Sequence, residues 1–387
     1  MHVAIDAHMV GENETGNETY TLNLVRGLLR ITQEAGSRDL DPVRLSLLSP
    51  HPERLRTRLA SLPSHAEIRT LRPGNALLRI PLSLPLTARR HRFDLLHVTY
   101  NAPPITPCPT VVTVHDIAFE RYPQFFSPRD QAILRTLVPP SIRRAARVIT
   151  VSQHAKREIM DRYGIPAEKI AVTYEAAADH FKPVVDRSAL DAVRERYGTG
   201  PSPFVLALGN LQPRKNMARL VEAFSAVAHL PQFDQVKLVV AGKAQWRESD
   251  IFEAVEGRGL TDRVIFPGYV DDNDVPALYS AASLFVFPTL YEGFGLPPLE
   301  AMACGTPVVC SNAASLPEVV GDAAVQVDPT DTDALAKAMA DVLGDPNQAN
   351  ELRERGLERA ARFSWDRCAA ETLAVYREVM QEREANG

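Results

Sequence analysis

The chain has 387 residues, of which 45% are hydrophobic and 24% are charged. This composition is typical of globular proteins and excludes global disorder. The length favours two domains over a single core. The net charge of −5 is uneven, because residues 1–182 carry 24 basic and 18 acidic side chains, whereas residues 183–387 carry 19 and 30. No apolar run reaches the roughly 18 residues of a membrane-spanning helix, and the first residues lack the basic start and apolar run of a secretion signal.

Short, β-branched apolar runs alternate with amphipathic segments along the first half of the chain. This alternation is typical of buried parallel strands joined by crossover helices. It therefore predicts one doubly wound domain. The predicted strands are 2–6, 44–49, 94–99, 110–116 and 147–152, and the predicted helices are 18–34, 127–145 and 153–163.

The same alternation begins again in the second half and predicts a second doubly wound domain. A stretch rich in Gly, Pro and Ser at 197–204 is the candidate linker. The fold class is therefore α/β, with Rossmann-like domains at 1–198 and 199–364 and a terminal helix at 365–387 that packs back toward the first domain. The predicted strands are 204–209, 237–242, 263–268, 283–288 and 307–310, and the predicted helices are 216–228, 274–282, 298–304, 331–343, 347–362 and 365–385.

In open α/β sheets, ligands bind outside the carboxyl ends of the strands, so two such domains facing each other form a central cleft. The most informative loop is 291–307, YEGFGLPPLEAMACGTP. Gly293 and Gly295 let the backbone approach a ligand, and the prolines that follow open a helix whose free N–H groups suit a diphosphate. Glu292 and Glu300 each offer a carboxylate to a hydroxylated ring. The alternative is a helix N-terminus with a stabilising acid in its first turn.

A second loop, 209–216 (GNLQPRKN), lies directly between a predicted strand and a predicted helix. Arg214 offers a forked guanidinium and Lys215 a compact charge to phosphate oxygens. Two cations beside a helix N-terminus are unfavourable unless an anion is present. The pair therefore indicates an anionic ligand, with an ordinary surface pair as the alternative.

At these positions the chain resembles the retaining glycosyltransferases of family 4, which have the GT-B fold of two Rossmann-like domains. The resemblance rests on the E-x7-E element at Glu292 and Glu300 and on the G-x4-R-K-N element described above. It covers nearly the whole chain and is greatest toward bacterial mannosyltransferase-type enzymes of polysaccharide and glycolipid assembly. Further matching runs are TVHD at 113–116, TVSQHAKREI at 150–159 and SLPEVVGDAA at 315–324.

The resemblance implies a role for each matching position, with the first domain on the acceptor side and the second binding the nucleotide sugar. Arg214 and Lys215 are expected to neutralise the diphosphate and the charge that builds on it as it leaves. Glu300 is expected to accept hydrogen bonds from the ribose, and Glu292 to bind hydroxyls of the donor sugar. His115, at the end of a first-domain strand, is expected beside the donor sugar and the acceptor, the alternative being a structural histidine.

The loop after the first strand departs from the family pattern. Relatives commonly carry a glycine pair and then a basic residue, as in GGIGRY, whereas ETGNETY at 14–20 keeps one glycine, and an acid, Glu18, replaces the usual Arg. We expect either that Glu18 points toward the acceptor or that the loop differs. The expected catalytic set is His115, Arg214, Lys215 and Glu292, and the expected donor-binding set is Gly16, Asn17, Gly209, Arg214, Lys215, Glu292, Gly293, Phe294, Gly295, Leu296 and Glu300.

No metal site and no cofactor are expected. The triplet Asp272–Asn273–Asp274 spells DxD, the metal-binding motif of the other large glycosyltransferase fold, but it precedes a predicted helix, where Asp274 suits the N-cap. The positive charge that a metal supplies is already present in the Arg-Lys pair. The cysteines are scattered without a CxxC pair, which favours reduced thiols in the cytoplasm over disulfides or a zinc site; they are Cys108, Cys304, Cys310 and Cys368.

The basic first half is compatible with anionic lipid, an anionic acceptor or nucleic acid, or with solvated surface charge. No zinc-finger or RNP-type signature is present, so we expect no nucleic-acid partner. The stretch 76–92 is apolar and then basic, a pattern that suits peripheral contact with the inner face of the membrane, as a lipid-linked acceptor requires. The prolines at 73, 81 and 85 argue against a long helix, and the alternative is a loop that enters a buried helix.

The resulting interpretation is a metal-independent, retaining hexosyltransferase that moves a hexose from a nucleotide sugar to a hydroxyl of a saccharide or lipid-linked acceptor. GDP-mannose is the leading donor and a UDP-hexose the alternative. Because both glutamates have binding roles, we expect front-face attack with the leaving phosphate taking the proton. Two other interpretations remain: a catalytically silent nucleotide-sugar-binding protein, and an isomerase or hydrolase that turns over the donor without an acceptor.

Overall fold

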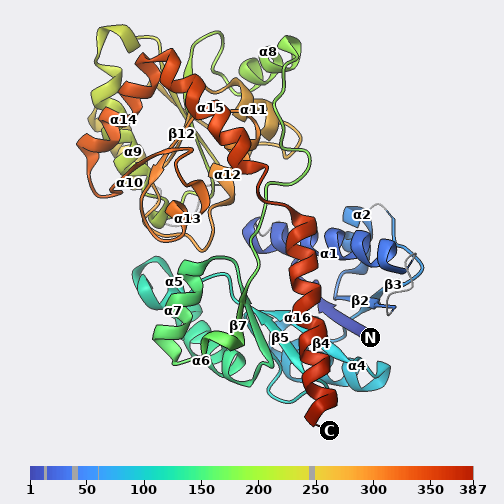
Figure 1. Cartoon of the computed structure of the whole chain (residues 1–387). Helices are drawn as coiled ribbons and strands as arrows, with labels where there is room; N and C mark the ends of the chain where they lie inside the picture. Colours follow the sequence, from blue (N-terminus) through green and yellow to red (C-terminus); the bar gives the residue numbers. More distant parts are fainter. Residues whose placement is uncertain (13–14, 37–41, 60, 244–248, 387) are drawn as a thin grey trace. The chain divides into compact units, whose positions relative to one another are not determined.

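The computed structural model describes residues 1–12, 15–36, 42–59, 61–243 and 249–386. The chain divides into two compact units, one made of residues 1–175 with 364–387 and the other of residues 176–363. Both are α/β units with a parallel sheet between layers of helices, as Figure 1 shows. The expected fold class is confirmed.

The first unit contains a seven-stranded parallel sheet in the order β3-β2-β1-β4-β5-β6-β7. Its inner strands are almost fully buried, which explains why they read as continuous apolar runs in the sequence. The strands are β1 (His2–Asp6), β2 (Arg44–Ser49), β3 (Ala66–Thr70), β4 (Leu95–Thr99), β5 (Thr110–Thr113), β6 (Arg147–Thr150) and β7 (Ile170–Val172).

The second unit contains a six-stranded parallel sheet in the order β10-β9-β8-β11-β12-β13. Its strands are β8 (Phe204–Leu208), β9 (Lys237–Ala241), β10 (Val264–Gly268), β11 (Leu284–Phe287), β12 (Val308–Ser311) and β13 (Val325–Val327). In each sheet the strand order reverses direction once, between β1 and β4 and between β8 and β11. Ligands of doubly wound sheets bind at this reversal, outside the carboxyl ends of the strands.

The helices of the first unit are α1 (Thr15–Gly36), α2 (Pro52–Leu59), α3 (Ala76–Leu78), a π-helical turn (Arg79–Ser83), α4 (Leu84–His91), α5 (Ala118–Arg121), α6 (Pro128–Arg144), α7 (Gln153–Tyr163) and α16 (Trp365–Asn386). Those of the second unit are α8 (Arg187–Arg196), α9 (Met217–Ala228), α10 (Ser249–Gly257), α11 (Val275–Ala281), α12 (Leu296–Ala303), α13 (Leu316–Val320), α14 (Thr332–Gly344) and α15 (Pro346–Ala360). No described helix is long and apolar enough to span a bilayer.

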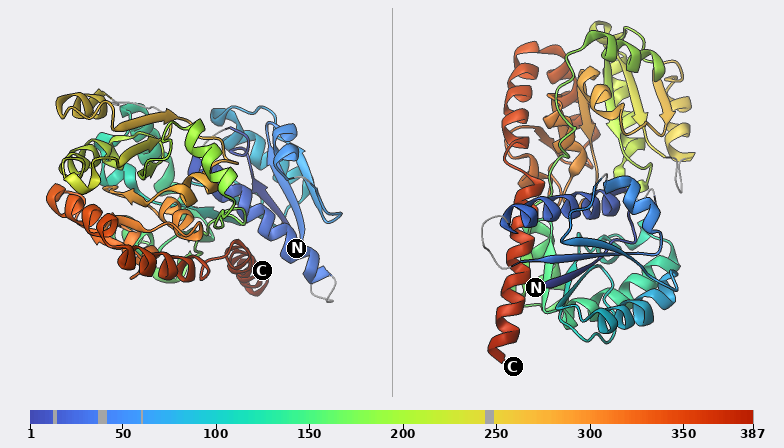
Figure 2. Two further views of the ribbon diagram at one scale, coloured as in Figure 1. Left: turned by 90° about the horizontal axis from the view of Figure 1, so that it is seen from above. Right: turned by 90° about the vertical axis from the view of Figure 1, so that its right-hand side faces the viewer.

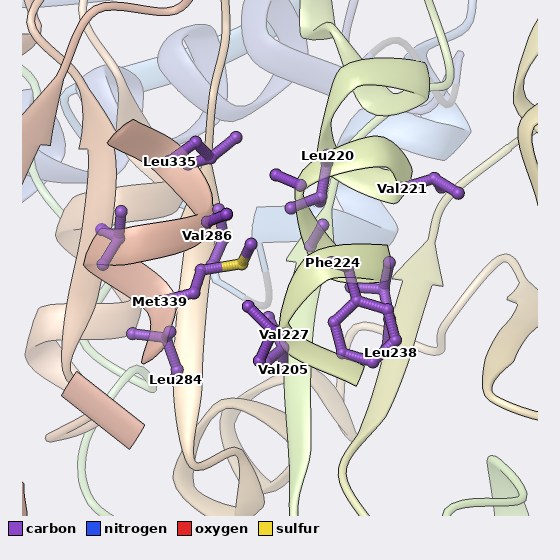
Figure 3. Close-up of a cluster of buried hydrophobic side chains, with 14 of the residues drawn as sticks. Val205, Leu220, Val221, Phe224, Val227, Leu238, Leu284, Val286, Leu335 and Met339 are labelled. Atoms are coloured by element: carbon purple, nitrogen blue, oxygen red, sulfur yellow. The ribbon is translucent and has the colours of Figure 1, made fainter. Parts of the chain in front are cut away.

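In the core of the second unit, two helices pack against the strands at the reversal of strand order. Helix α9 places Phe224 and Val227 against the sheet beside Val205 of β8, and α14 places Met339 toward Val286 of β11 (Figure 3). All five side chains are essentially inaccessible to solvent. The two strands that flank the reversal of strand order are thus held by two helices on one face.

The last helix of the chain belongs to the first unit, where α16 packs along α1 (Figures 1 and 2). The two helices approach closely at Gly27, where a Cβ would lie 2.8 Å from the Trp365 carbonyl oxygen and 2.9 Å from the Ala369 Cβ. A larger residue at this position would separate the helices. Arg30 adds an ion pair with Asp366 at 2.6 Å.

The structure differs from the sequence interpretation at the domain boundary. Residues 176–198 belong to the second unit, because they are bonded to it: Arg194 Nη2 of α8 donates to the Ala281 carbonyl at 2.8 Å, and the Val184 amide, just before α8, donates to Ser280 Oγ at 3.0 Å. The candidate linker at 197–204 is instead the turn between α8 and β8, with Gly198 and Gly200 at positive φ.

Three strands were not predicted: β3, β7 and β13. β3 is half-buried at the sheet edge and carries Glu67 and Arg69, whereas β7 and β13 have only three residues each. Residues 76–91 were expected to lack a long helix. They form a continuous helical run, with Pro81 inside the π-helical turn and Pro85 in the first turn of α4, where its missing N–H costs little.

A chain of buried hydrogen bonds ties α16 to the sheet and to α1. The Tyr376 hydroxyl lies 2.6 Å from His97 Nδ1, and His97 Nε2 lies 2.7 Å from the Thr113 hydroxyl. The Thr113 hydroxyl also lies 2.9 Å from the Tyr20 hydroxyl. Burial lowers the pKa of His97 to about 3, so the ring is neutral at pH 7 and both its nitrogens need a partner.

Replacing Tyr376 with Phe should therefore leave His97 Nδ1 buried without a partner. We expect Tyr376→Phe to lower the free energy of unfolding by about 1–3 kcal/mol, measured by denaturant unfolding of the full chain followed by circular dichroism. Tyr269→Phe is the matched control, because Tyr269 is 56% exposed and its hydroxyl donates to the exposed Asp272, and it should change that free energy by less than about 0.5 kcal/mol. Equal unfolding midpoints for the two variants would contradict the network.

Candidate active site

Two loops meet at the reversal of strand order in the second unit. The first follows β8 and runs from Gly209 through a 3₁₀ turn, Pro213–Lys215, to Asn216, which has φ of 61° and opens α9. The second follows β11 and leads into α12. The Leu290 amide donates to the Arg214 carbonyl at 2.8 Å, so the two loops are joined directly.

A buried carboxylate holds two cations between these loops. Arg214 Nη1 and Lys215 Nζ each lie 2.6 Å from the same oxygen, Glu292 Oε1, and the Thr289 hydroxyl lies 3.1 Å from it. Lys215 is 7% exposed and Glu292 9%. Burial alone would raise the pKa of Glu292, but Arg214 and Lys215 outweigh burial and hold this pKa below its usual value. The cluster therefore carries one net positive charge.

Residues of the segment 315–324 hold the loop that carries Glu292. Ser315 Oγ donates to the Glu292 carbonyl at 2.9 Å and to the Phe294 carbonyl at 2.6 Å. Gly295 has φ of 115°, and a Cβ there would lie 2.5 Å from Leu316 Cδ2. Gly295 is therefore required both by the backbone conformation and by the space. Helix α12 begins at the next residue, Leu296, with prolines in its first turn.

Glu300, the second acid of the E-x7-E element, has a different environment. Its Oε2 accepts a hydrogen bond from the Tyr279 hydroxyl at 3.3 Å. Burial raises the pKa of Glu300 to about 7; Tyr279 and Lys215 act against this rise, and Asp272 adds to it. At neutral pH the carboxyl is therefore poised between its two protonation states, and hydrogen-bond donors near it would favour the ionised one.

This arrangement suits a diphosphate joined to a hydroxylated ring. Arg214 and Lys215 supply positive charge, and the free N–H groups at the start of α12 point to the same end of the sheet. Gly293 and Phe294 lie in the loop between the cations and the helix, so their backbone can approach a ligand. All residues expected in the second domain thus gather at one place within the second unit.

In the first unit, His115 follows β5 at the carboxyl end of the sheet. It is buried, and neither ring nitrogen makes a hydrogen bond within the described part of the chain. Tyr20 packs edge-on against the ring with centroids 4.6 Å apart, and Glu175 Oε1 lies 3.7 Å from Nε2. Burial lowers the pKa of His115 to about 4, so the ring is neutral at pH 7. A proton on Nε2 facing the Glu175 carboxylate leaves Nδ1 to accept from a hydroxyl.

The loop after β1 shows how the departure at Glu18 is accommodated. Glu18 does not point outward: it is buried, its Oε1 accepts from the Gly11 amide at 2.8 Å, and Arg58 Nη2 lies 3.7 Å away. Of the two alternatives, the structure supports a different loop. Gly16 and Asn17 lie in the first turn of α1, with Gly16 exposed.

The DxD triplet is engaged in hydrogen bonds within the second unit. Asp274 stands at the N-cap of α11, but its side chain makes no capping bond; it binds Arg196 and the Tyr197 hydroxyl instead, which corrects the expected role. Asp272 accepts from the Tyr269 hydroxyl at 2.8 Å. Within the described ranges no group of His, Cys, Asp or Glu could hold a metal ion, and the four cysteines are buried and form no disulfide.

Sequence reasoning missed several residues that shape these sites. Thr289 and Ser315 hold the Glu292 loop, and Asn216 Nδ2 donates to the carbonyls of Pro288 and Pro329 at 3.1 and 2.7 Å. Ser315 and Asn216 lie in the matched runs, so the motifs contained a signal for them. Glu175 had no such signal, because it follows a strand too short to be predicted.

The family comparisons agree with this geometry. The profile described as "Glycosyltransferase Family 4" matches residues 15–176, and the profile described as "Glycosyl transferases group 1" matches residues 191–359. The chain is 36% identical over 270 residues to O-antigen chain mannosyltransferase B of Escherichia coli, covering 69% of this chain and 70% of that protein. It is 35% identical over 243 residues to the serotype-specific mannosyltransferase WbdA of Escherichia coli, covering 62% of this chain and 29% of that protein.

Solved structures show the same fold. The Anabaena protein Alr3699/HepE, in complex with UDP and glucose, superposes with a TM-score of 0.74 over 97% of this chain and 100% of that one, at 22% identity. At that identity the likeness concerns the fold alone. The two doubly wound units, their loops at the reversal of strand order and the relatives that match them show that this chain belongs to the GT-B glycosyltransferases of family 4 and is a hexosyltransferase.

Proposed function

We propose that this enzyme is a retaining mannosyltransferase that moves mannose from GDP-mannose to a hydroxyl of a saccharide or glycolipid acceptor. The observation that carries the proposal is the buried cluster of Arg214, Lys215 and Glu292 at the reversal of strand order, which suits a nucleoside diphosphate. Mannose is favoured because the relatives at 35–36% identity are mannosyltransferases. A UDP-hexose is the alternative donor.

In the proposed mechanism, the bond between the sugar C1 and the diphosphate oxygen breaks as the acceptor oxygen bonds to C1 on the same face. The acceptor proton passes to the leaving phosphate oxygen. Arg214 and Lys215 stabilise the negative charge on the leaving diphosphate, so no metal is needed. Glu292 is bound to these two cations and Glu300 is assigned to the ribose, so neither is placed as a covalent nucleophile, which favours front-face attack.

His115 would contact a sugar hydroxyl from the acceptor side. As a neutral ring, it orients the hydroxyl through a hydrogen bond without adding charge beside the oxocarbenium-like sugar. Glu175 would be a positioning residue that fixes the ring tautomer. A hydrolase would release mannose from GDP-mannose without an acceptor, whereas a transferase should depend on one; product release in both conditions separates the two.

Donor binding provides the first test. GDP and GDP-mannose at a hundred times their dissociation constant should stabilise the folded enzyme by about 2.7 kcal/mol. The stabilisation is measured in the presence of EDTA as a rise in melting temperature. Arg214→Ala should weaken GDP binding roughly 10- to 100-fold, since it removes a charge-assisted contact. Arg258→Ala, an exposed arginine in the same unit, should bind GDP normally. A larger shift with UDP than with GDP would reject GDP-mannose as the donor.

The pH dependence of binding should follow Glu300. Ribose hydroxyls donate to the ionised carboxylate, so affinity for GDP-mannose should be full above pH 7 and fall as pH drops through about 7, up to tenfold per unit. GDP-mannose is the suitable ligand because its diphosphate lacks the terminal ionisation that GDP has. Calorimetry from pH 8 to 5.5 measures the effect. Glu300→Gln should bind GDP-mannose more weakly, and its affinity should not change with pH in this range. If the variant keeps the pH dependence of the wild type, the ionisation belongs to another group.

His115→Ala tests the acceptor side. We expect kcat/KM for transfer to fall roughly tenfold through the lost hydrogen bond, while affinity for GDP stays unchanged, because its expected contacts lie mainly in the second unit. His51→Ala, an exposed histidine of the first unit, is the control. Wild-type kcat/KM in His115→Ala would show that His115 is only structural.

A further inference from the structure

A stripe of leucines faces solvent on the helical run 76–91 of the first unit. Leu78, Leu82 and Leu86 are spaced by four residues, so they lie on one side of the helix. Their exposed fractions are 41%, 49% and 64%, and Leu77 beside them is 84% exposed. The opposite side is buried, with Ser83, Leu84 and Ala88 facing the unit. Most other exposed large apolar side chains stand singly, so a stripe of this kind is informative.

A cationic pocket adjoins this leucine stripe. It has a volume of about 550 Å³ and lies between α4 and the edge strand β3. Its positive charge comes from Arg69, Arg72 and Arg90; His91 and Leu86 of the stripe also line it. Crowding of positive charge is evident at His91, whose pKa is lowered by burial and then by Arg69 and Arg90.

The acids nearby do not balance this charge. Between residues 68 and 93 the sequence has no Asp or Glu and six arginines: Arg69, Arg72, Arg79, Arg89, Arg90 and Arg92. Arg69 is paired with Glu67, and Arg79 faces the buried Asp6. The remaining four are exposed and have no ion pair in the described part of the chain. Apolar side chains next to unpaired arginines match the boundary between acyl chains and anionic headgroups.

We propose that the helical run 76–91 and the adjoining pocket form a docking site for an anionic lipid bilayer. Leu78, Leu82 and Leu86 insert at the level of the acyl boundary. Arg72 and Arg90 bind headgroup phosphates, one of which the pocket admits. Arg89 and Arg92 add attraction to the negative surface. None of its residues belongs to the expected catalytic or donor-binding sets.

Flotation of the full-length protein with vesicles tests this proposal. We expect flotation with vesicles that contain 30% phosphatidylglycerol, none with pure phosphatidylcholine, and weaker binding at high salt. Arg72→Ser/Arg90→Ser should lower the partition coefficient roughly thirtyfold, from two lost phosphate contacts. Leu82→Ser/Leu86→Ser should lower it roughly tenfold or more. All four side chains are exposed, and unchanged melting temperatures verify that both variants fold.

Matched controls distinguish this site from general charge or hydrophobicity. Arg129→Ser/Arg144→Ser removes two other exposed arginines of the first unit, and Ile105→Ser removes another exposed apolar residue, 80% exposed. Both should float like the wild type. The proposal is wrong if the wild-type protein stays in the soluble fraction with both vesicles, if the leucine variant floats normally, or if the arginine control loses as much binding as Arg72→Ser/Arg90→Ser.

Discussion

The candidate site of the second unit depends on one carboxylate oxygen shared by two cations. Removing a carboxylate from water costs several kcal/mol unless close partners compensate it, and Arg214 and Lys215 do so for Glu292 at 2.6 Å each. The contact also joins the loops after β8 and β11, which are far apart in sequence. One net positive charge is left beside the start of α12 while the acid stays ionised, and this charge suits the diphosphate of the proposed donor.

The two acids of the E-x7-E element show how position decides their chemistry. Glu292 lies against two cations and has a lowered pKa, whereas burial raises the pKa of Glu300, eight residues later, to about 7. Paired acids with such divergent environments serve different roles. Glu292 holds the two cations in place. Hydrogen-bond donors near Glu300 shift its carboxyl toward the ionised state, as expected of a group proposed to bind ribose hydroxyls.

The elements that position the site were predictable because their sequence patterns are local. The strands β8 and β11, the glycines after them and the Arg-Lys pair follow from apolar runs and loop chemistry within a few residues. What escaped prediction depends on distant contacts. The boundary at residue 175 is set by Val184 bonding to Ser280 and Arg194 of α8 bonding to Ala281. Glu18 turns inward because it binds the Gly11 amide and lies near Arg58, and Asp274 binds Arg196 and Tyr197 instead of capping α11.

The cationic pocket and His115, which is proposed to contact a sugar hydroxyl, both belong to the first unit. The cationic pocket lies beside β3, whose residues Ile68, Arg69 and Thr70 line it, and His115 follows β5 of the same sheet. Four strand spacings separate β3 from β5 in the order β3-β2-β1-β4-β5, which at about 4.8 Å each amounts to roughly 19 Å. A headgroup phosphate bound in the pocket would therefore lie about this far across the sheet from His115. An acceptor whose lipid phosphate occupied the pocket would need a head long enough to cover this distance, which favours an extended glycan over a bare lipid phosphate.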